Sequence, residues 1–311
     1  MIITMLGDFR YAWCTPNLMA RTLGRMGHDI IRIQEDEAGL FDVVNKANSS
    51  DLFFWSMTYG MLGLDGSKML SLIKVPTFTY HLDVLVGIER EDMIKENPFF
   101  KLDYFFQTDG DPETLKRYKD LGVNAFWLPA ACSKEECYLA PKVKDFQHDI
   151  IFVGSYKYHK EHQYRGMLIN WLRSVYNKRF CLYPDDRNMF MKGHELNQLY
   201  ATAKVVIGDS FGATPPRKNY WSNRVPETTG RGGFLIHRKV EGMEKFYADG
   251  KDLVTYDNGD FSQLRDYIDY YLYHDAEREK IKRSGMQYTK ENQTFDNRIE
   301  EMFKIMGVIN E

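Results

Sequence analysis

The residue types best suited to chemistry stand between Asn223 and Ile236, in the sequence N-R-V-P-E-T-T-G-R-G-G-F-L-I. Arg224 and Glu227 are three residues apart, so a helix would place them one turn apart on the same side. A carboxylate accepts hydrogen bonds from hydroxyls, whereas an arginine and the free amides of a helix N-terminus attract anionic oxygens. The pattern suits a ligand with ribose hydroxyls and a diphosphate, such as a nucleotide sugar. The alternative is a surface salt bridge, worth only a few tenths of a kcal/mol.

Strands and helices are predicted on both sides of this motif. Apolar runs at 204–208, 233–237 and 252–256 predict strands, and the patterns at 195–203 and 240–247 predict short helices. At this point the chain resembles the spore-maturation-protein-like branch of the group 1 glycosyltransferases, which have the GT-B fold. The resemblance is carried by R-x-x-E from Arg224, G-x-x-G-F-L-I from Gly230, F-Y-A-D-G-K-D-L-V-T-Y from Phe246, R-x-x-I-K-R-S-G from Arg278, F-W-L-P-A-A from Phe126 and D-I-I-F-V-G-S from Asp149.

The resemblance implies a donor site in the second half of the chain. Glu227 would bind the donor ribose and Arg224 the diphosphate, while Thr228 and Thr229 would offer hydroxyls or amides at the helix start. Many retaining relatives carry two glutamates in an E-x7-E arrangement. Here no acidic residue stands between Phe211 and Pro226, so the sequence leaves the stereochemical outcome open.

A second candidate for diphosphate contact follows the strand expected at 149–153. Gly154 and Ser155 come directly after this strand, and Arg165 follows with Lys157 and Lys160. Glycine allows backbone amides to approach a phosphate closely, and a following helix N-terminus favours negative charge. The alternative is an ordinary strand-to-helix turn with a solvated basic face.

The first half is expected to hold the acceptor. Gly7, Asp8 and Arg10 follow its first strand, and His81 and Asp83 follow its fourth. A general base that takes a proton from an acceptor hydroxyl must be a His, Asp or Glu at the site, which makes His81 and Asp83 the catalytic candidates. Structural hydrogen bonding is the alternative role for a His-x-Asp pair.

We predict no metal and no cofactor beyond the donor itself. His159 and His162 have the spacing of two ligands on one helix face, but no third ligand accompanies them at a recognisable spacing. Asp185 and Asp186 follow Pro184 in an expected turn, where aspartate is common for backbone reasons.

The fold expected from these patterns is α/β, with two doubly wound Rossmann-like domains facing a central cleft, as in GT-B enzymes. In the first half, strands at 2–6, 29–33, 51–55, 76–80, 103–107 and 125–128 alternate with helices, two of them predicted at 17–26 and 67–73, as parallel sheets require. We place the first domain at 1–146, the nucleotide-sugar domain at 147–290, and a C-terminal helix at 291–311. Residues 292–306 have helical apolar spacing, and the resemblance implies that this helix crosses back to the first domain.

Composition narrows the class of protein. The formal charge of −3 in 311 residues gives no basic excess for a tight, sequence-independent grip on nucleic acid. The four cysteines include no C-x-x-C, which suits a reducing compartment. No run approaches the ~18 apolar residues of a membrane span, and the N-terminus lacks a signal-peptide pattern. We expect a cytoplasmic protein.

The resemblance implies a metal-independent, hexosyltransferase-like glycosyltransferase that uses a nucleotide-diphosphate sugar, most simply a UDP-sugar. The acceptor is left open among a glycan, a small molecule, a protein and modified DNA, as for phage enzymes that glycosylate hydroxymethyl-pyrimidine bases. The aromatic and basic stretch at 215–224 suits nucleic acid, whereas the overall acidity opposes it. The alternatives from other classes are a non-catalytic nucleotide-sugar-binding protein and a nucleotide-sugar epimerase.

Overall fold

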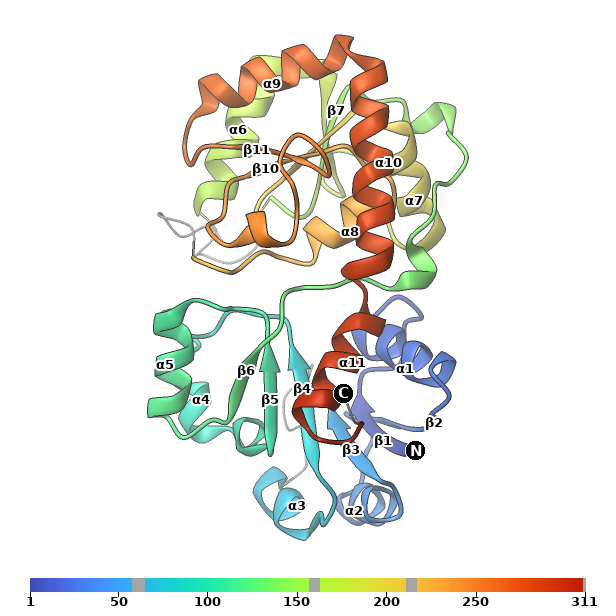
Figure 1. Cartoon of the computed structure of the whole chain (residues 1–311), viewed down its shortest axis with the longest axis vertical. Helices are drawn as coiled ribbons and strands as arrows, with labels where there is room; N and C mark the ends of the chain where they lie inside the picture. The colour runs from blue at the N-terminus through green and yellow to red at the C-terminus, as the bar shows by residue number, and fades with distance from the viewer. Residues whose placement is uncertain (58–64, 157–162, 211–216, 310–311) are drawn as a thin grey trace. The chain divides into compact units, whose positions relative to one another are not determined.

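The chain folds into two compact units, each built on its own parallel sheet (Figure 1). The structure, a computed structural model, describes residues 1–57, 65–156, 163–210 and 217–309. The first unit comprises Met1–Pro129 and Phe295–Glu311, and the second comprises Ala130–Thr294. No helix in the described ranges is long and apolar enough to cross a membrane.

The first unit contains a six-stranded sheet in the order β2-β1-β3-β4-β5-β6, with every neighbouring pair parallel. Its strands are β1 (Ile2–Gly7), β2 (Asp29–Gln34), β3 (Leu52–Trp55), β4 (Thr77–His81), β5 (Tyr104–Gln107) and β6 (Ala125–Trp127). The chain runs outward from β1 to β2 and then crosses back to β3. The strand order therefore reverses between β1 and β3, and such a reversal opens a crevice at the carboxyl ends of the strands.

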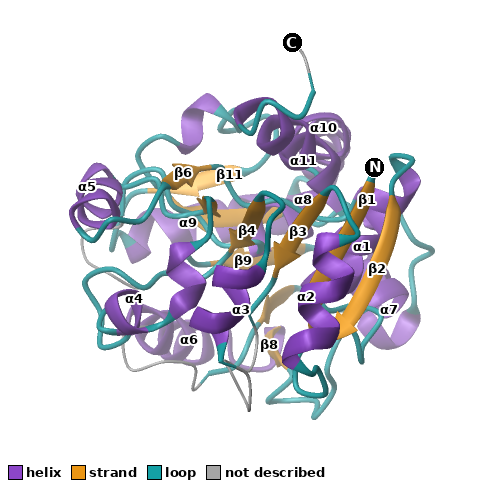
Figure 2. Ribbon diagram, turned by 90° about the horizontal axis from the view of Figure 1, so that it is seen from below, coloured by secondary structure: helices purple, strands orange, loops and turns teal. Residues whose placement is uncertain are grey.

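Helices cover both faces of this sheet. They are α1 (Thr15–Arg25), α2 (Leu40–Asn48), α3 (Gly66–Leu72), α4 (Met93–Glu96), α5 (Pro112–Asp120) and α11 (Phe295–Ile305), with a 3-10 turn η1 (Pro98–Lys101). On one face α2 and α3 lie side by side (Figure 2) and bury Val43 and Met69 with Phe53 and Trp55 in one apolar cluster. On the other face α11 packs against α1. The ring centroid of its Phe303 lies 6.2 Å from that of Phe78 in β4.

The last helix returns to the first unit, where Arg25 of α1 pairs with Asp296 at 2.7 Å. The helix expected at 292–306 is confirmed as α11 (Phe295–Ile305). Helix α10 (Asp275–Asn292) ends before it. The break arises because Gln293 and Thr294 pair with the backbone of Cys132, whose N–H donates to the Gln293 carbonyl at 3.2 Å.

The second unit contains a five-stranded sheet in the order β11-β10-β9-β7-β8, again with every neighbouring pair parallel. Its strands are β7 (Ile150–Val153), β8 (Phe180–Tyr183), β9 (Val205–Gly208), β10 (Leu235–Arg238) and β11 (Val254–Tyr256). Its helices are α6 (Gln163–Tyr176), α7 (Gly193–Thr202), α8 (Arg224–Gly230), α9 (Phe261–Tyr273) and α10, with 3-10 turns η2 (Lys134–Glu136), η3 (Lys144–Phe146), η4 (Asn177–Arg179) and η5 (Met243–Lys245). The strand order here reverses between β7 and β9.

Several features of the second unit differ from the sequence prediction. Strand β8 was not predicted, and no residue ranges were predicted for helices α6, α9 and α10. The helix expected at 240–247 is only the short turn η5. Gly242 explains this last difference, because it adopts the left-handed φ of 96° just before η5, which ends a right-handed helix.

The stretch 130–146, assigned to the first domain from the sequence, packs within the second unit. The Asn197 side-chain amide of α7 donates to the carbonyls of Glu136 and Tyr138 at 2.8 and 3.0 Å, and Glu136 forms an ion pair with Arg231. These bonds hold the segment to α7 and α8. The two units therefore divide at Pro129, earlier than the residue 146 expected from composition.

Candidate functional site

The carboxyl ends of β7 and β9 flank the point where the second sheet reverses its strand order. Gly154 follows β7, Asp209 follows β9, and Arg224 is the first residue of α8. The Arg224 guanidinium inserts between the two strand ends: Nε donates to the Val153 carbonyl at 2.9 Å, and Nη1 donates to the Asp209 carbonyl and carboxylate at 2.8 and 2.9 Å. The arginine predicted to bind phosphate thus lies at the position where doubly wound sheets bind ligands.

Asp209 joins two arginines. Its other carboxylate oxygen accepts a hydrogen bond from Nε of Arg165 at 2.9 Å, and its side chain is fully buried. Arg165 and Arg224 both lie over the ring of Phe152, at 5.7 and 5.0 Å from its centroid. The shared carboxylate therefore holds two guanidiniums at one sheet edge, and guanidiniums suit the oxygens of a diphosphate.

Gly154 explains how the guanidinium fits. A Cβ at this position would lie 2.7 Å from Nη2 of Arg224, and Gly154 has a φ of 150°, which side-chain-bearing residues rarely adopt. Nη2 itself makes no hydrogen bond to any residue in the described ranges, and the Arg224 side chain is 15% exposed. The third nitrogen of this guanidinium is therefore available to an anion. Burial lowers the pKa of Arg224, and the nearby Asp209 carboxylate raises it.

Glu227 is half-buried one turn further along α8. Its carboxylate pairs neither with Arg224 nor with any other group among the residues that the structure describes. The surface salt bridge considered as an alternative from the sequence is therefore not formed. A half-buried carboxylate without a protein partner is costly unless a ligand or water satisfies it.

Thr228 and Thr229 do not lie at the helix start, because α8 begins at Arg224 and ends at Gly230. Both residues are buried. The Thr229 hydroxyl donates to the Val225 carbonyl at 2.9 Å and lies 2.7 Å from the Thr289 hydroxyl of α10. The Thr228 hydroxyl is buried with no hydrogen-bond partner among the described residues. The expected place of both threonines at the helix start is wrong, whereas their contact with the donor stays a prediction.

Of the other donor-side candidates, Ser155 lies beside Arg165, whose Nη1 donates to the Ser155 carbonyl at 3.5 Å. The structure thus brings Gly154, Ser155, Arg165 and Arg224 together at one sheet edge. Lys157, Lys160, His159 and His162 fall outside the described residues. Within the described ranges, no three His, Cys, Asp or Glu side chains are grouped to hold a metal ion.

A buried histidine supports the start of α8. Burial lowers the pKa of His237 to about 4, so its ring is neutral at pH 7. Nδ1 lies 2.6 Å from the Arg238 carbonyl and must carry the proton, because a carbonyl only accepts. Nε2 then accepts from the Ser210 hydroxyl at 3.1 Å, and Ser210 in turn accepts from the Ser222 amide at 3.1 Å. This chain of bonds fixes the backbone just before Arg224.

The acceptor candidates Gly7, Asp8 and Arg10 lie where the first sheet reverses its order. A Cβ at Gly7 would come within 3.1 Å of Pro16, so glycine allows α1 to begin close to β1. Asp8 is buried and accepts from the backbone and side chain of Arg10 at 3.1 and 3.0 Å and from Gln34 at 3.1 Å. Arg10 also pairs with Asp36 at 3.0 Å. These residues form a rigid polar edge rather than a set of free ligands.

His81 and Asp83 occupy different environments at the end of β4. The His81 ring packs against Phe99 and Phe105, and its Nε2 is buried with no hydrogen-bond partner among the described residues. Burial lowers the pKa of His81, while the Asp83 carboxylate raises it. Asp83 is exposed, so it is the better placed of the two to take a proton from an acceptor.

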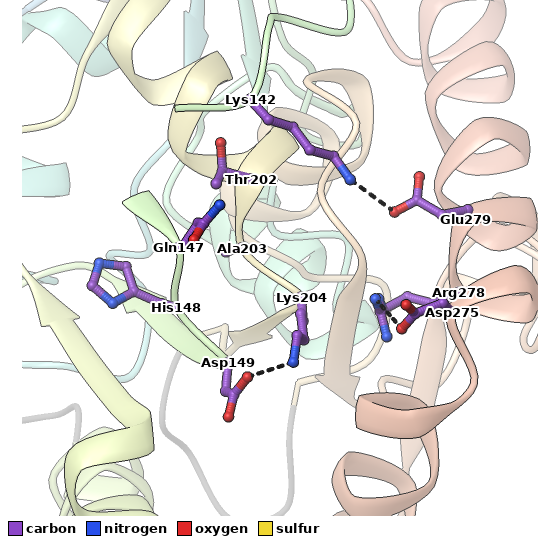
Figure 3. Close-up of a pocket in the computed structure, with 10 residues that line it drawn as sticks. All are labelled: Lys142, Gln147, His148, Asp149, Thr202, Ala203, Lys204, Asp275, Arg278 and Glu279. Atoms are coloured by element: carbon purple, nitrogen blue, oxygen red, sulfur yellow. Dashed lines mark hydrogen bonds and ion pairs between the residues drawn. The ribbon is translucent and has the colours of Figure 1, made fainter. Parts of the chain in front are cut away.

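A separate cavity of about 400 Å³ lies at the opposite, amino end of the second sheet (Figure 3). Its charged side chains pair with one another: Lys204 with Asp149 at 2.8 Å, Arg278 with Asp275 at 2.7 Å, and Lys142 with Glu279 at 3.8 Å. Each of these three cations therefore has an acidic partner in the cavity, whereas Nη2 of Arg224 makes no hydrogen bond to a described residue.

Asp209 and His237 were not predicted as site residues from the sequence. An acidic residue directly after a buried strand of a parallel sheet was the available signal for Asp209. Nothing local distinguishes His237 from a strand residue, because its role depends on Ser210 from the neighbouring strand end.

Comparison with known proteins agrees with this geometry. No curated protein matches the chain by sequence. Among solved structures, HepE from Anabaena in complex with UDP-glucose has a TM-score of 0.66 at 9% identity, covering 99% of this chain and 100% of that one. An alpha-glucosyltransferase in complex with UDP has a TM-score of 0.73 at 11% identity, covering 99% and 100%.

Sucrose-phosphate synthase from Thermosynechococcus elongatus has a TM-score of 0.62 at 12% identity, covering 99% of each chain. These likenesses confirm the predicted GT-B fold of two Rossmann-like domains. The model of the glycosyl transferase-like family matches residues 142–304, a little over half of the chain and all of the Arg224 edge. The chain therefore belongs to the glycosyl transferase-like family.

Proposed function

We propose that this glycosyltransferase takes its sugar from uridine diphosphate sugars and transfers it to a hydroxyl acceptor. The observation that carries the proposal is the pair of unsatisfied groups on α8, the half-buried Glu227 carboxylate and Nη2 of Arg224. A carboxylate and a cation one turn apart match a ribose diol and a diphosphate. The similar folds crystallised with UDP or UDP-glucose support uridine as the base.

In this proposal, Arg224 and Arg165 stabilise the negative charge that develops on the departing diphosphate. Asp209 holds both guanidiniums in place before the donor arrives, so no reorganisation is needed during the reaction. Asp83 takes the proton of the acceptor hydroxyl. We expect no metal, because the two arginines would supply the positive charge.

The resemblance at 246–256 and 278–285 supports placing the chain in the spore-maturation-protein-like branch. All four cysteines are free thiols in the structure, which agrees with a reducing compartment such as the cytoplasm.

The test is a binding measurement with UDP and UDP-glucose on the wild type and on Glu227→Ala. A ligand that binds only the folded state raises the melting temperature, and calorimetry gives its Kd. We expect Glu227→Ala to weaken UDP about 10- to 100-fold, as the loss of charge-assisted hydrogen bonds predicts. Its melting temperature without ligand should not fall, because the substitution removes a half-buried carboxylate that has no protein partner.

The matched control is Glu241→Ala, an exposed glutamate of the same unit that pairs only with Lys218. It should leave UDP binding intact. Equal UDP binding by the wild type and Glu227→Ala would contradict the proposed donor site, and no binding of any nucleotide diphosphate by the wild type would favour a structural role.

A further inference from the structure

The loop after β1 presents two large aromatic side chains to solvent. Tyr11 and Trp13 are 53% and 43% exposed, and their rings stack with centroids 5.0 Å apart at an angle of 18°. Exposed tryptophan and tyrosine side by side are unusual on a surface that has no binding role. We name this pair the aromatic platform.

The platform stands on a fixed backbone. The Asn17 side-chain amide donates to the carbonyls of Phe9 and Tyr11 at 2.7 and 2.9 Å, and Arg21 donates to the Ala12 carbonyl at 2.9 Å. Gln34 accepts from the Phe9 amide at 2.8 Å. The rings are therefore held in place before any ligand binds, which lowers the entropy cost of binding.

The platform lies at the carboxyl end of the first sheet, next to the point where the strand order reverses. In doubly wound sheets this is where ligands bind. An exposed aromatic face there can stack on one side of a pyranose ring, because the C–H groups of the sugar are attracted to the negative ring face.

The charge of the first unit favours a neutral sugar over a nucleic acid as the ligand of the platform. The first unit carries 15 lysine and arginine residues against 22 aspartate and glutamate, a formal charge of −7, whereas the second carries 26 against 22, a charge of +4. The two loops next to the platform contain one cation, Arg10, and four acids, Asp8, Glu35, Asp36 and Glu37. Arg21 of α1, which donates to the Ala12 carbonyl, adds a second cation, so the four acids still outnumber the cations at this edge. Binding of a polyanion depends on neutralising its phosphates with cations, and this balance opposes it.

We infer that the aromatic platform binds the acceptor, and that the acceptor is an uncharged carbohydrate. This inference rests on the proposed transferase function and names its acceptor class. The basic unit would take the anionic donor, and the acidic unit would take a neutral sugar.

The test is binding of the full-length chain to an array of neutral glycans, anionic glycans and single- and double-stranded DNA, in about 0.1 M salt. Trp13→Ala and Tyr11→Ala are the variants. Tyr273→Ala is the control, because this tyrosine is 77% exposed but lies in the second unit. The Kd of UDP is measured for each variant to separate the acceptor site from the donor site.

We expect binding to at least one neutral glycan, weakened about five- to tenfold by the loss of either ring and unchanged by Tyr273→Ala. UDP affinity should stay the same in all three variants. The inference is overturned if no neutral glycan binds, or if Tyr11→Ala and Trp13→Ala both bind the glycan as tightly as the wild type. It is also overturned if DNA binds instead and this binding depends on Trp13. If the wild type binds a neutral glycan but does not bind UDP, the proposed donor site is refuted and the inferred acceptor site is not.

Discussion

Nη1 of Arg224 and a carboxylate oxygen of Asp209 lie 2.9 Å apart, and this contact ties the first residue of α8 to the end of β9. Because Asp209 also pairs with Arg165, a single buried carboxylate sets the positions of both guanidiniums at the donor edge.

Asp209→Asn should destabilise the protein by about 3 to 5 kcal/mol, because it leaves two largely buried arginines without their anion. Urea unfolding measures the change. Asp42→Asn is the control, since Asp42 forms an exposed pair with Lys46 within α2 and its loss should cost under about 0.5 kcal/mol. A cost for Asp209→Asn no larger than that of the control would show that the buried pairs contribute nothing net.

Gly154→Ala should displace the Arg224 guanidinium, because the new methyl group would lie 2.7 Å from Nη2. We expect UDP affinity to fall about tenfold or more, together with a loss of stability of about 1 to 3 kcal/mol from the strained backbone. Gly166→Ala in α6 is the matched control, since a Cβ there meets no atom within 4 Å. It should stabilise the helix slightly. Unchanged UDP affinity in Gly154→Ala would exclude a close contact between this loop and the diphosphate.

His237 should make the protein less stable in mild acid. Its pKa falls from 6.5 to about 4 on burial, so between these values the unfolded chain binds more protons than the folded one. The stabilisation is complete above pH 6.5 and decreases as the pH falls toward 4. Between about pH 7.5 and about pH 5, the free energy of unfolding of the wild type should fall by roughly 2 kcal/mol more than that of His237→Gln. Denaturant unfolding at the two pH values measures this, and parallel losses in both proteins would contradict it.

Asp83→Asn should lower turnover about 100-fold or more while leaving the Kd of UDP unchanged, because a general base acts on the acceptor side only. UDP release from UDP-glucose, with water or a neutral glycan as acceptor, reports the rate. Asp92→Asn, at another exposed aspartate of the same unit, is the control. A larger effect of His81→Gln than of Asp83→Asn would reassign the base to the histidine.

Most of the fold was predictable because parallel strands have a strong local signal. Buried runs such as Phe53–Phe54 or Val205–Val206 are apolar on both faces, and each strand except β8 was expected near its observed place. Strand β8 (Phe180–Tyr183) was missed because only its pairing with β7 identifies the short F-C-L-Y run as a strand. The last helix was expected from residue 292 and begins at Phe295, because Gln293 and Thr294 pair with Cys132, more than 150 residues away.

The donor edge was predicted in part. Arg224, Gly154 and Arg165 come together as expected, since the ends of neighbouring strands must meet. Asp209, which holds the arginines, was not recognised, because its importance follows from two partners at distances of 15 and 44 residues along the chain. Thr228 and Thr229 were placed at the wrong end of α8, since sequence alone does not fix where a seven-residue helix begins.

Helix α11 follows both sheets in the sequence. The second unit is one continuous segment that ends at Thr294, whereas at that point the first unit still lacks the helix that packs against Phe78 and pairs with Arg25. During synthesis the apolar face under α11 therefore stays uncovered until the second unit has been made. The first unit can therefore complete its fold only after the second unit has been made. A nascent chain interrupted before Phe295 would leave the apolar face around Phe78 exposed.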